Sequence, residues 1–421
     1  MNKISRINLK NNSATICSLE CYYKENNEAS PKRIGGTGTF TAGNNKTLDL
    51  NGLGIPEGAL VTAYANVKAG DDSHGDNWFT FSKGWDGEAY FEVTGSAFKT
   101  GVFFMEVTDF ETNIEDMTAY RLDDAVLSLN NLETEGVYEK IKGLKYFPDL
   151  ISGHVQGYTQ YEKDGNLYFL FTHSTNSKYG YILQTINNSD NTQDFRTTAG
   201  WSHPAGIQCL GPYLFVPCEE GSESTVFVYD VLRNMTKVQI IKCSHRAGCI
   251  GVTDFKRNNE TYVLLLVGDQ QVYYAYVAKK QTLIKDLKFE SFGKIDLGSN
   301  RTKEEDDFFN KDSVNCQGIG LVTDKNEEVH MLALMTHGSE DKVYMLKINI
   351  DFENKSVSYK TETSAHLINK GGIAGSAGSH FRWGAGIRVT PAKQLVILAT
   401  SRNIIAGTKL DTTSWYKTKK D

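Results

Sequence analysis

The sequence lacks several features that would place it in a specialised class of protein. It has only 7 prolines in 421 residues, and 45 Lys and Arg nearly balance 51 Asp and Glu, for a net charge of −6. This balance argues against a disordered chain and against a basic protein that binds nucleic acid. No apolar run approaches the roughly 18 residues that span a bilayer, and residues 1–12 lack the apolar stretch of a secretory signal. We therefore expect a cytoplasmic globular protein with no membrane span and no nucleic-acid partner, which would leave the cell only by a non-classical route.

Paired cysteines and common enzyme signatures are also missing. The seven cysteines are odd in number and include no CxxC pair. A complete disulfide framework and a zinc site of the two-CxxC type are therefore not expected, and we predict reduced, mostly buried thiols. The chain has no P-loop, no Gly-x-Ser-x-Gly elbow and no His-Glu-x-x-His helix. These absences favour a protein that is not an enzyme, but they leave the question open.

Glycine and aromatic residues are abundant instead, with 38 Gly, 21 Tyr and 21 Phe. This composition is typical of many short strands joined by tight turns, so an all-β fold is predicted. Residues 1–110 contain roughly eight short strand-like runs, a spacing that favours an N-terminal β-sandwich domain. Residues 111–136 are acidic and partly apolar, and we expect them to form a connector with a short helix near 122–129.

Five similar segments follow the connector. Each begins with a His or Asn and continues with a short gap, a Gly, a first strand, a turn, an apolar second strand and an aromatic third strand. Their first residues are His154, His203, His245, Asn315 and His380. Steps of roughly 40 to 70 residues, the longer ones with polar insertions, are typical of propeller blades. The sequence therefore predicts a five-bladed β-propeller over residues 137–421.

The last of these segments ends before a fourth strand. Residues 137–143, VYEKIKG, precede the first segment at the place where a fourth strand would lie. We predict that this strand pairs with the last blade and closes the ring, which would remove two exposed sheet edges.

Two stretches resemble families of uncharacterised proteins. The string KNNSA, followed by GNNKTLDLNGLGIPEGALVTAYANVKAGDD and WFTF, resembles a small β-sandwich module of bacterial and fungal proteins. SHPAGIQCLGPYLFVPCE resembles the repeat of propeller proteins whose blades begin with a His-Pro-Gly-Gly-Ile-Gln-like motif, with Ala205 within that motif. The resemblance implies a sandwich followed by a propeller and carries no activity.

The shared first residues of the five segments are the strongest functional candidates. In a propeller they would ring one mouth of the central channel. Neutral imidazoles that converge on an axis suit a divalent metal, for which the ligands would be His154, His203, His245 and His380. Two other interpretations stay open, namely hydrogen bonds within the blades, inherited from one ancestral repeat, and contacts with a polar ligand. We expect no other cofactor.

A second set of polar residues follows the apolar second strands. His173 and His337 occupy matching positions there, and the corresponding places in the other blades hold Glu219, Asp269 and Arg402. Trp201 and Trp383 flank the histidines in the sequence, and an indole can stack on a sugar ring. Solvated strand ends and core packing are the alternative interpretations of these residues.

Repetition of one unit favours a non-enzymatic, lectin-like recognition protein that binds a glycan or another small polar ligand at the propeller mouth, because linked weak sites gain avidity. The first alternative is a metal-dependent oxygenase or lyase that uses the axial histidines. The second is a platform for a protein partner, such as a component of a toxin-like assembly. The blade starts offer His and Asn in place of the acid pair that a glycosidase needs.

Overall fold

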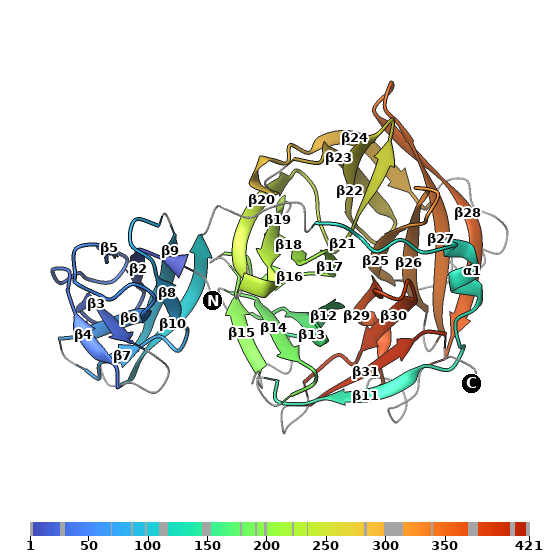
Figure 1. The fold of residues 1–421 in the computed structure, drawn as a ribbon. Coiled ribbons are helices and arrows are strands. Elements are labelled where there is room, and N and C mark those ends of the chain that lie inside the picture. Colours follow the sequence, from blue (N-terminus) through green and yellow to red (C-terminus); the bar gives the residue numbers. More distant parts are fainter. Residues whose placement is uncertain are drawn as a thin grey trace. The chain divides into compact units, whose positions relative to one another are not determined.

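The computed structural model describes residues 3–25, 30–68, 70–85, 87–96, 99–108, 117–144, 153–176, 179–189, 192–197, 200–220, 223–233, 235–281, 284–298, 315–337, 340–368, 378–404 and 409–417. The chain divides into two compact units, Met1–Thr112 with Tyr229–Val238, and Asn113–Val228 with Gln239–Asp421. Strands make up almost all of the regular structure, which confirms the predicted all-β class (Figure 1). Within the described ranges, no helix is long and apolar enough to cross a membrane.

The first unit contains two β-sheets. One has the order β1 (Lys3–Ile4), β8 (Phe79–Phe81), β6 (Leu60–Val67), β3 (Cys17–Lys24) and β4 (Lys32–Ile34), with β7 (Ser73–His74) paired to β6. The other has the order β10 (Lys99–Thr108), β9 (Glu88–Ser96), β2 (Arg6–Asn11) and β5 (Asn45–Asp49). Phe79 of the first sheet packs against Phe91 and Phe104 of the second, with ring centroids 6.0 and 5.2 Å apart. The two sheets therefore share one aromatic core, as expected for the predicted sandwich.

Residues 137–417 form five blades, counted over the described residues (Figure 1). Blade 1 comprises β12 (Val155–Lys163), β13 (Asn166–His173), β14 (Tyr181–Ile186) and β15 (Thr192–Arg196). The first strand of blade 2 is split into β16 (His203–Pro204) and β17 (Gln208–Leu210). It is followed by β18 (Tyr213–Glu220), β19 (Glu223–Asp230) and β20 (Thr236–Cys243). Blade 3 comprises β21 (Cys249–Arg257), β22 (Glu260–Asp269), β23 (Val272–Lys279) and β24 (Glu290–Asp296), and blade 4 comprises β25 (Asn315–Thr323), β26 (Val329–His337), β27 (Glu340–Asp351) and β28 (Ser356–Leu367). Blade 5 comprises β29 (His380–Val389), β30 (Leu395–Thr400), β31 (Leu410–Trp415) and β11 (Val137–Ile141). Short 3-10 helices lie at η2 (Val231–Arg233) and η3 (Ile284–Asp286). The predicted five-bladed propeller is thus confirmed.

The outer strand of blade 5 comes from the start of the unit. β11 pairs antiparallel with β31, in a register that runs from Val137 opposite Ser414 to Ile141 opposite Leu410. Gly136, just before β11, is required by this approach, because a Cβ atom there would lie 2.2 Å from Cγ2 of Thr413. β12 of blade 1 also bridges to β29 of blade 5, so the first and last blades form one continuous sheet.

Glycines allow the first strands of the blades to approach one another at the axis. A Cβ atom on Gly157 would lie 2.7 Å from the carbonyl oxygen of Ala205 in the next blade. One on Gly318 would lie 2.8 Å from Cβ of Ala385. The glycine that recurs in the five sequence segments therefore has a packing role.

Gln208 fills part of the axis itself. Its Oε1 accepts hydrogen bonds from the backbone N–H groups of Val252 and Leu321, both at 2.9 Å, and its Nε2 donates to the carbonyl of Leu321 at 2.7 Å. The side chain is 6% exposed. One amide from blade 2 thus satisfies backbone groups of blades 3 and 4 that have no neighbouring strand to pair with.

The connector predicted over 111–136 is described from residue 117, and 111–116 lie outside the described residues. Its helix α1 spans Ala125–Asn130 and begins at Asp124, whose Oδ1 accepts the N–H of Leu127 at 2.8 Å. Such a side-chain cap satisfies one of the open donors of the first turn. Before α1, the backbone of Leu122 donates to Thr323 at 3.1 Å and so ties the connector to blade 4.

All seven cysteines lie within the described ranges and are free, and all but Cys209 are buried. Burial raises the pKa of the Cys21 thiol to about 12, and that of the Cys316 thiol also to about 12. These cysteines are protonated at neutral pH and behave as small apolar side chains.

Candidate functional site at the histidine mouth

The first strands of blades 1, 2, 4 and 5 begin at the same end of the propeller. His154 precedes β12, His203 lies in β16, and His380 is the first residue of β29. Asn315 is the first residue of β25, but its side chain lies outside the described residues, as does that of His337 at the end of β26. We call this end the histidine mouth, formed by His154, Gln156, His173, His203, Glu219, Trp383 and Arg402.

Gln156 joins the first two histidines. Its Nε2 lies 2.8 Å from Nε2 of His154 and 2.9 Å from Nε2 of His203. Because an amide nitrogen can only donate, both imidazoles accept at Nε2 and carry their proton on Nδ1. The lone pairs with which these two histidines could ligate a metal are therefore engaged by the amide.

Glu219 continues this network toward blade 3. It lies opposite His203 in the pairing of β16 with β18, and its Oε2 is 3.7 Å from Nδ1 of His203. Its Oε1 accepts the N–H of Ala247 at 2.9 Å. The carboxylate is thus fixed between two blades, and the His203 side chain beside it remains 43% exposed.

Trp383 lies on the other side of His154. Its indole meets the His154 ring edge to face, with centroids 5.8 Å apart. The guanidinium groups of Arg382 and Arg402 each lie 5.0 Å from the indole centroid, within the range of a cation–π contact. The backbone N–H of Val155 donates to the carbonyl of Arg402 at 2.9 Å, which holds this part of blade 5 against blade 1.

His173 lies at the end of β13 and is 3% exposed. Burial lowers its pKa to about 4, and the neighbouring His154 acts in the same direction. A contact with the Ser174 backbone opposes this shift. His173 is therefore neutral at physiological pH and adds no charge to the mouth.

The other predicted residues make contacts elsewhere. The ring of His245 stacks on Tyr274 of β23 at 3.6 Å, and burial lowers its pKa, so this histidine packs into its own blade. Trp201 meets Phe227 of β19 edge to face at 5.9 Å. Nδ1 of His380 lies 3.4 Å from Oδ2 of the buried Asp341 on β27, a pair that joins blades 4 and 5.

Sequence reasoning did not identify Gln156, Arg382 or Asp341. A signal existed for Gln156, because a glutamine also follows two residues after Asn315, in blade 4. The partnership of Asp341 with His380 depends on the packing of neighbouring blades, and no sequence spacing encodes it.

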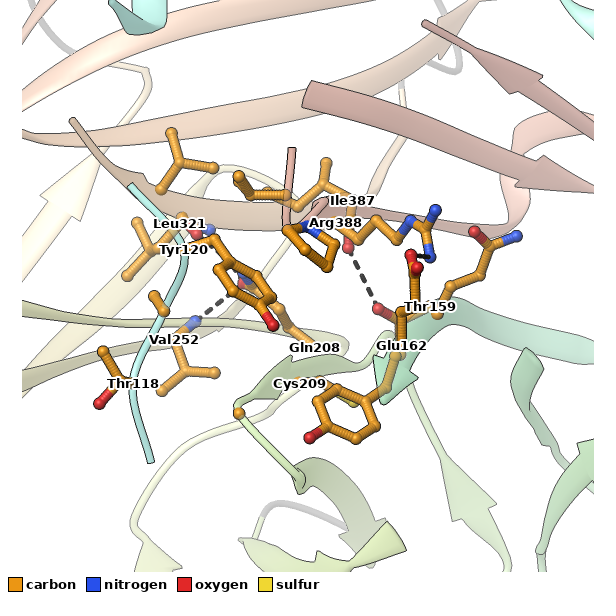
Figure 2. A pocket seen from close by; sticks show the side chains of 17 residues that line it. Thr118, Tyr120, Thr159, Glu162, Gln208, Cys209, Val252, Leu321, Ile387 and Arg388 are labelled. Atoms are coloured by element: carbon orange, nitrogen blue, oxygen red, sulfur yellow. Dashed lines mark hydrogen bonds and ion pairs between the residues drawn. The ribbon is translucent and has the colours of Figure 1, made fainter. Parts of the chain in front are cut away.

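The opposite end of the first strands holds a small pocket (Figure 2). The last residues of the first strands line it together with Thr118 and Tyr120 of the connector. Figure 2 shows Arg388 directed at Glu162, with Nη1 3.4 Å from Oε2, and burial lowers the pKa of this arginine. The cavity measures about 50 Å³, which suits one or two water molecules and is far below the roughly 300 Å³ of a small-molecule site. A larger cavity of about 660 Å³ lies over blade 3 and is lined by Tyr262, Lys279 and Phe352 among others. We place the candidate site at the histidine mouth on the chemistry of its side chains.

No family model matches the chain, and no curated protein matches it. Among solved structures, the fold is similar to the catalytic domain of Coprinopsis cinerea GH62 α-L-arabinofuranosidase, with 8% identity, a TM-score of 0.40 and coverage of 68% of this chain and 96% of that chain. It is also similar to CoXyl43, a GH43 β-xylosidase/α-arabinofuranosidase from a compost microbial metagenome, with 9% identity, a TM-score of 0.28 and coverage of 66% and 95%. A third match is the NanB sialidase of Streptococcus pneumoniae, with 9% identity, a TM-score of 0.32 and coverage of 85% and 63%. At these values the similarities assign no activity to this chain.

Proposed function

We propose that this protein is a recognition protein that binds a saccharide at the histidine mouth without converting it. The observation that carries the proposal is the hydrogen-bonded arc of Gln156, His154 and His203 next to the indole of Trp383. The resemblance to uncharacterised sandwich and propeller proteins adds no activity to this proposal.

The chemistry of the mouth suits a polyhydroxylated ligand. Sugar hydroxyl groups both donate and accept hydrogen bonds, and the mouth offers the half-exposed imidazole of His203 and the acceptor oxygens of Glu219. An indole supplies the apolar face that packs on the C–H surface of a sugar ring. Arg402 has a buried Nε without a hydrogen-bond partner, and its guanidinium would favour a saccharide that carries a carboxylate.

The mouth is also preorganised. Gln156 fixes the two imidazoles, the Ala247 N–H fixes Glu219, and the backbone bond from Val155 fixes the segment that carries Arg402. Groups that are already held lose little side-chain entropy when a ligand binds, so more of the contact energy appears as affinity.

The alternative of a metal-dependent enzyme would need the Nε2 lone pairs of His154 and His203. Both accept from Gln156, so metal binding there would require the amide to leave. This observation favours a binding protein over an enzyme that uses the axial histidines.

The test begins with the full-length chain on an array of neutral and acidic oligosaccharides, followed by calorimetric titration of the best saccharide. We expect Trp383→Ala to raise Kd about tenfold, because loss of the indole face removes about 1.4 kcal/mol. Trp78→Ala is the matched control, since that indole lies in the first unit beside Tyr22 and Lys24. It should leave Kd unchanged.

Three results would contradict the proposal. The first is no saccharide binding at millimolar concentration, and the second is an equal loss of affinity in the Trp78 and Trp383 variants. The third is cleavage or oxidation of the bound saccharide during prolonged incubation, detected by NMR. A full equivalent of metal that is lost in His203→Ala would support the metal-dependent alternative instead.

A further inference from the structure

The turn between β25 and β26 gathers three side chains that can ligate a metal. Asp324 and Glu328 lie on the turn, and His330 is the second residue of β26. One ligand atom from each lies within 4.8 Å of the others, and across the described residues this is the one such group of His, Cys, Asp and Glu side chains. We propose that Asp324, Glu328 and His330 bind a divalent metal ion.

The turn itself fixes the first ligand. Oδ1 of Asp324 accepts the backbone N–H groups of Asn326 and Glu328, both at 2.9 Å. The backbone N–H of Asp324 donates to the carbonyl of Glu328 at 3.0 Å, which closes the turn. Asp324 is 4% exposed, and its Oδ2 is directed toward His330.

His330 provides the observation that points to a ligand. Its side chain is 3% exposed, and Nε2 has no hydrogen-bond partner. The carboxylate oxygen facing it, Oδ2 of Asp324, is 4.0 Å away, too far for a hydrogen bond. A buried imidazole nitrogen without a partner is unfavourable. A metal ion between Nε2 of His330 and Oδ2 of Asp324, which also accepts from Nδ2 of Asn326 at 3.4 Å, would satisfy that nitrogen.

The separations agree with a shared ion. Bonds of about 2.0–2.2 Å to a tetrahedral Zn²⁺ place two ligand atoms roughly 3.4 Å apart. Small rotations of the Asp324 and Glu328 side chains would bring the 4.0 Å separation between Asp324 and His330, and the other separations of at most 4.8 Å, to this value. One imidazole with two carboxylates suits Zn²⁺ or Mn²⁺ better than Ca²⁺, which prefers an all-oxygen shell.

Two further side chains support the ligands. Oε2 of Glu362, on β28, lies 3.0 Å from Nδ1 of His330. A carboxylate this close favours the tautomer with the proton on Nδ1 and so leaves the lone pair on Nε2 for a metal, although the two groups are not aligned as a hydrogen bond. Lys347 forms an ion pair with Oε1 of Glu328, so Oε2 of that carboxylate is the oxygen left for the ion.

The position of this group indicates a structural role, separate from the proposed saccharide binding. The connector pairs with this turn, because Leu122 donates to the carbonyl of Thr323 and accepts from the N–H of Lys325 at 2.8 Å. An ion bound to Asp324 and Glu328 would stiffen the turn and thereby hold the connector to blade 4.

The test is calorimetric titration of the full-length, chelator-treated protein with ZnCl₂, MnCl₂ and CaCl₂, with parallel metal analysis after dialysis. We expect one equivalent of Zn²⁺ or Mn²⁺ to bind and to raise the melting temperature. Asp324→Asn keeps an oxygen for the two turn N–H groups but removes the charge, and we expect at least a tenfold loss of affinity. Glu328→Gln should behave in the same way.

Asp351→Asn is the matched control. Asp351 closes the β27–β28 turn in a similar manner, since its Oδ1 accepts from Glu353 and Asn354 at 2.9 and 3.0 Å, and it is not part of the group. It should bind metal like the unmodified protein. The proposal is wrong if no metal binds, if Asp324→Asn keeps its equivalent, if the control loses as much affinity, or if His203→Ala abolishes binding. Failure of saccharide binding would leave these results unaffected, because they are measured with the metal alone.

Discussion

Gln208 allows a prediction in which a more apolar replacement is the more harmful one. Replacement by Ala or by Leu removes the bonds to Val252 and Leu321, and so leaves two backbone N–H groups and one carbonyl without their partner. Each buried group that stays unsatisfied costs about 1–3 kcal/mol. The three together set an upper range of about 3–9 kcal/mol.

Water decides how much of this range is reached. Gln208 lines the cavity of about 50 Å³ at the end of the first strands opposite the histidine mouth, so truncation to Ala would open room for water beside the freed backbone groups. Leu fills nearly the volume of Gln and excludes that water. We expect Gln208→Ala to lower the free energy of unfolding by about 1–3 kcal/mol and Gln208→Leu by at least about 3 kcal/mol.

Urea denaturation followed by near-UV circular dichroism measures both values, provided that the denaturant slope is unchanged. The urea midpoint should be highest for the unmodified protein, lower for Gln208→Ala and lowest for Gln208→Leu. A Leu variant that is as stable as the unmodified protein would show that hydrophobic burial outweighs the lost bonds. An Ala variant less stable than the Leu variant would show that no water replaces the amide.

Three other predictions concern stability. A fragment of residues 1–110 should be soluble and unfold cooperatively, because its sheets share their own aromatic core; a molten or aggregating fragment would contradict this. Gly136→Ala should lower the free energy of unfolding by about 1–3 kcal/mol, measured by thermal or urea unfolding, because the new Cβ meets Thr413. Gly38 has open space around it, so Gly38→Ala should leave the stability almost unchanged. Equal effects of the two variants would refute the close approach at Gly136. The pKa of His173 falls from 6.5 to about 4 on folding, so the folded protein disfavours protonation of this side chain. The contribution of neutral His173 to the free energy of unfolding is complete above pH 6.5. It decreases by up to about 3 kcal/mol as the pH falls toward 4. His173→Gln should therefore flatten the loss of urea stability between pH 6.5 and 4, and an unchanged pH profile would contradict the burial argument.

The sequence predicted the fold correctly where a position accepts only one type of residue for a physical reason. The glycine of each segment, such as Gly157 or Gly318, recurs because no side chain fits at the axis, and that recurrence made the five blades predictable. The register of the blade starts was likewise sufficient to place His154 and His203 at one mouth.

Side-chain partners were not predictable in the same way. His245 has the same sequence context as His203, yet it stacks on Tyr274 in its own blade, because the chain before β21 reaches the sheet four residues later. Asp324 and His330 lie close in sequence but match no established ligand spacing, and Glu362 comes from another strand. Such contacts depend on strand register and rotamers, which the residue pattern does not specify.

The pairing of β11 with β31 determines when the ring can be completed during synthesis. Tyr138 of β11 donates to Asp411 of β31, a partner 273 residues further along the chain. A ribosome must therefore release nearly the whole propeller before β11 finds its neighbour, and until then the edge of β11 stays open to strands of other chains. Closing so large a loop is slow. The nascent protein thus passes through an open-ring stage in which exchange of β11 between two copies competes with closure, and the relative rates of these two steps decide the yield of monomer.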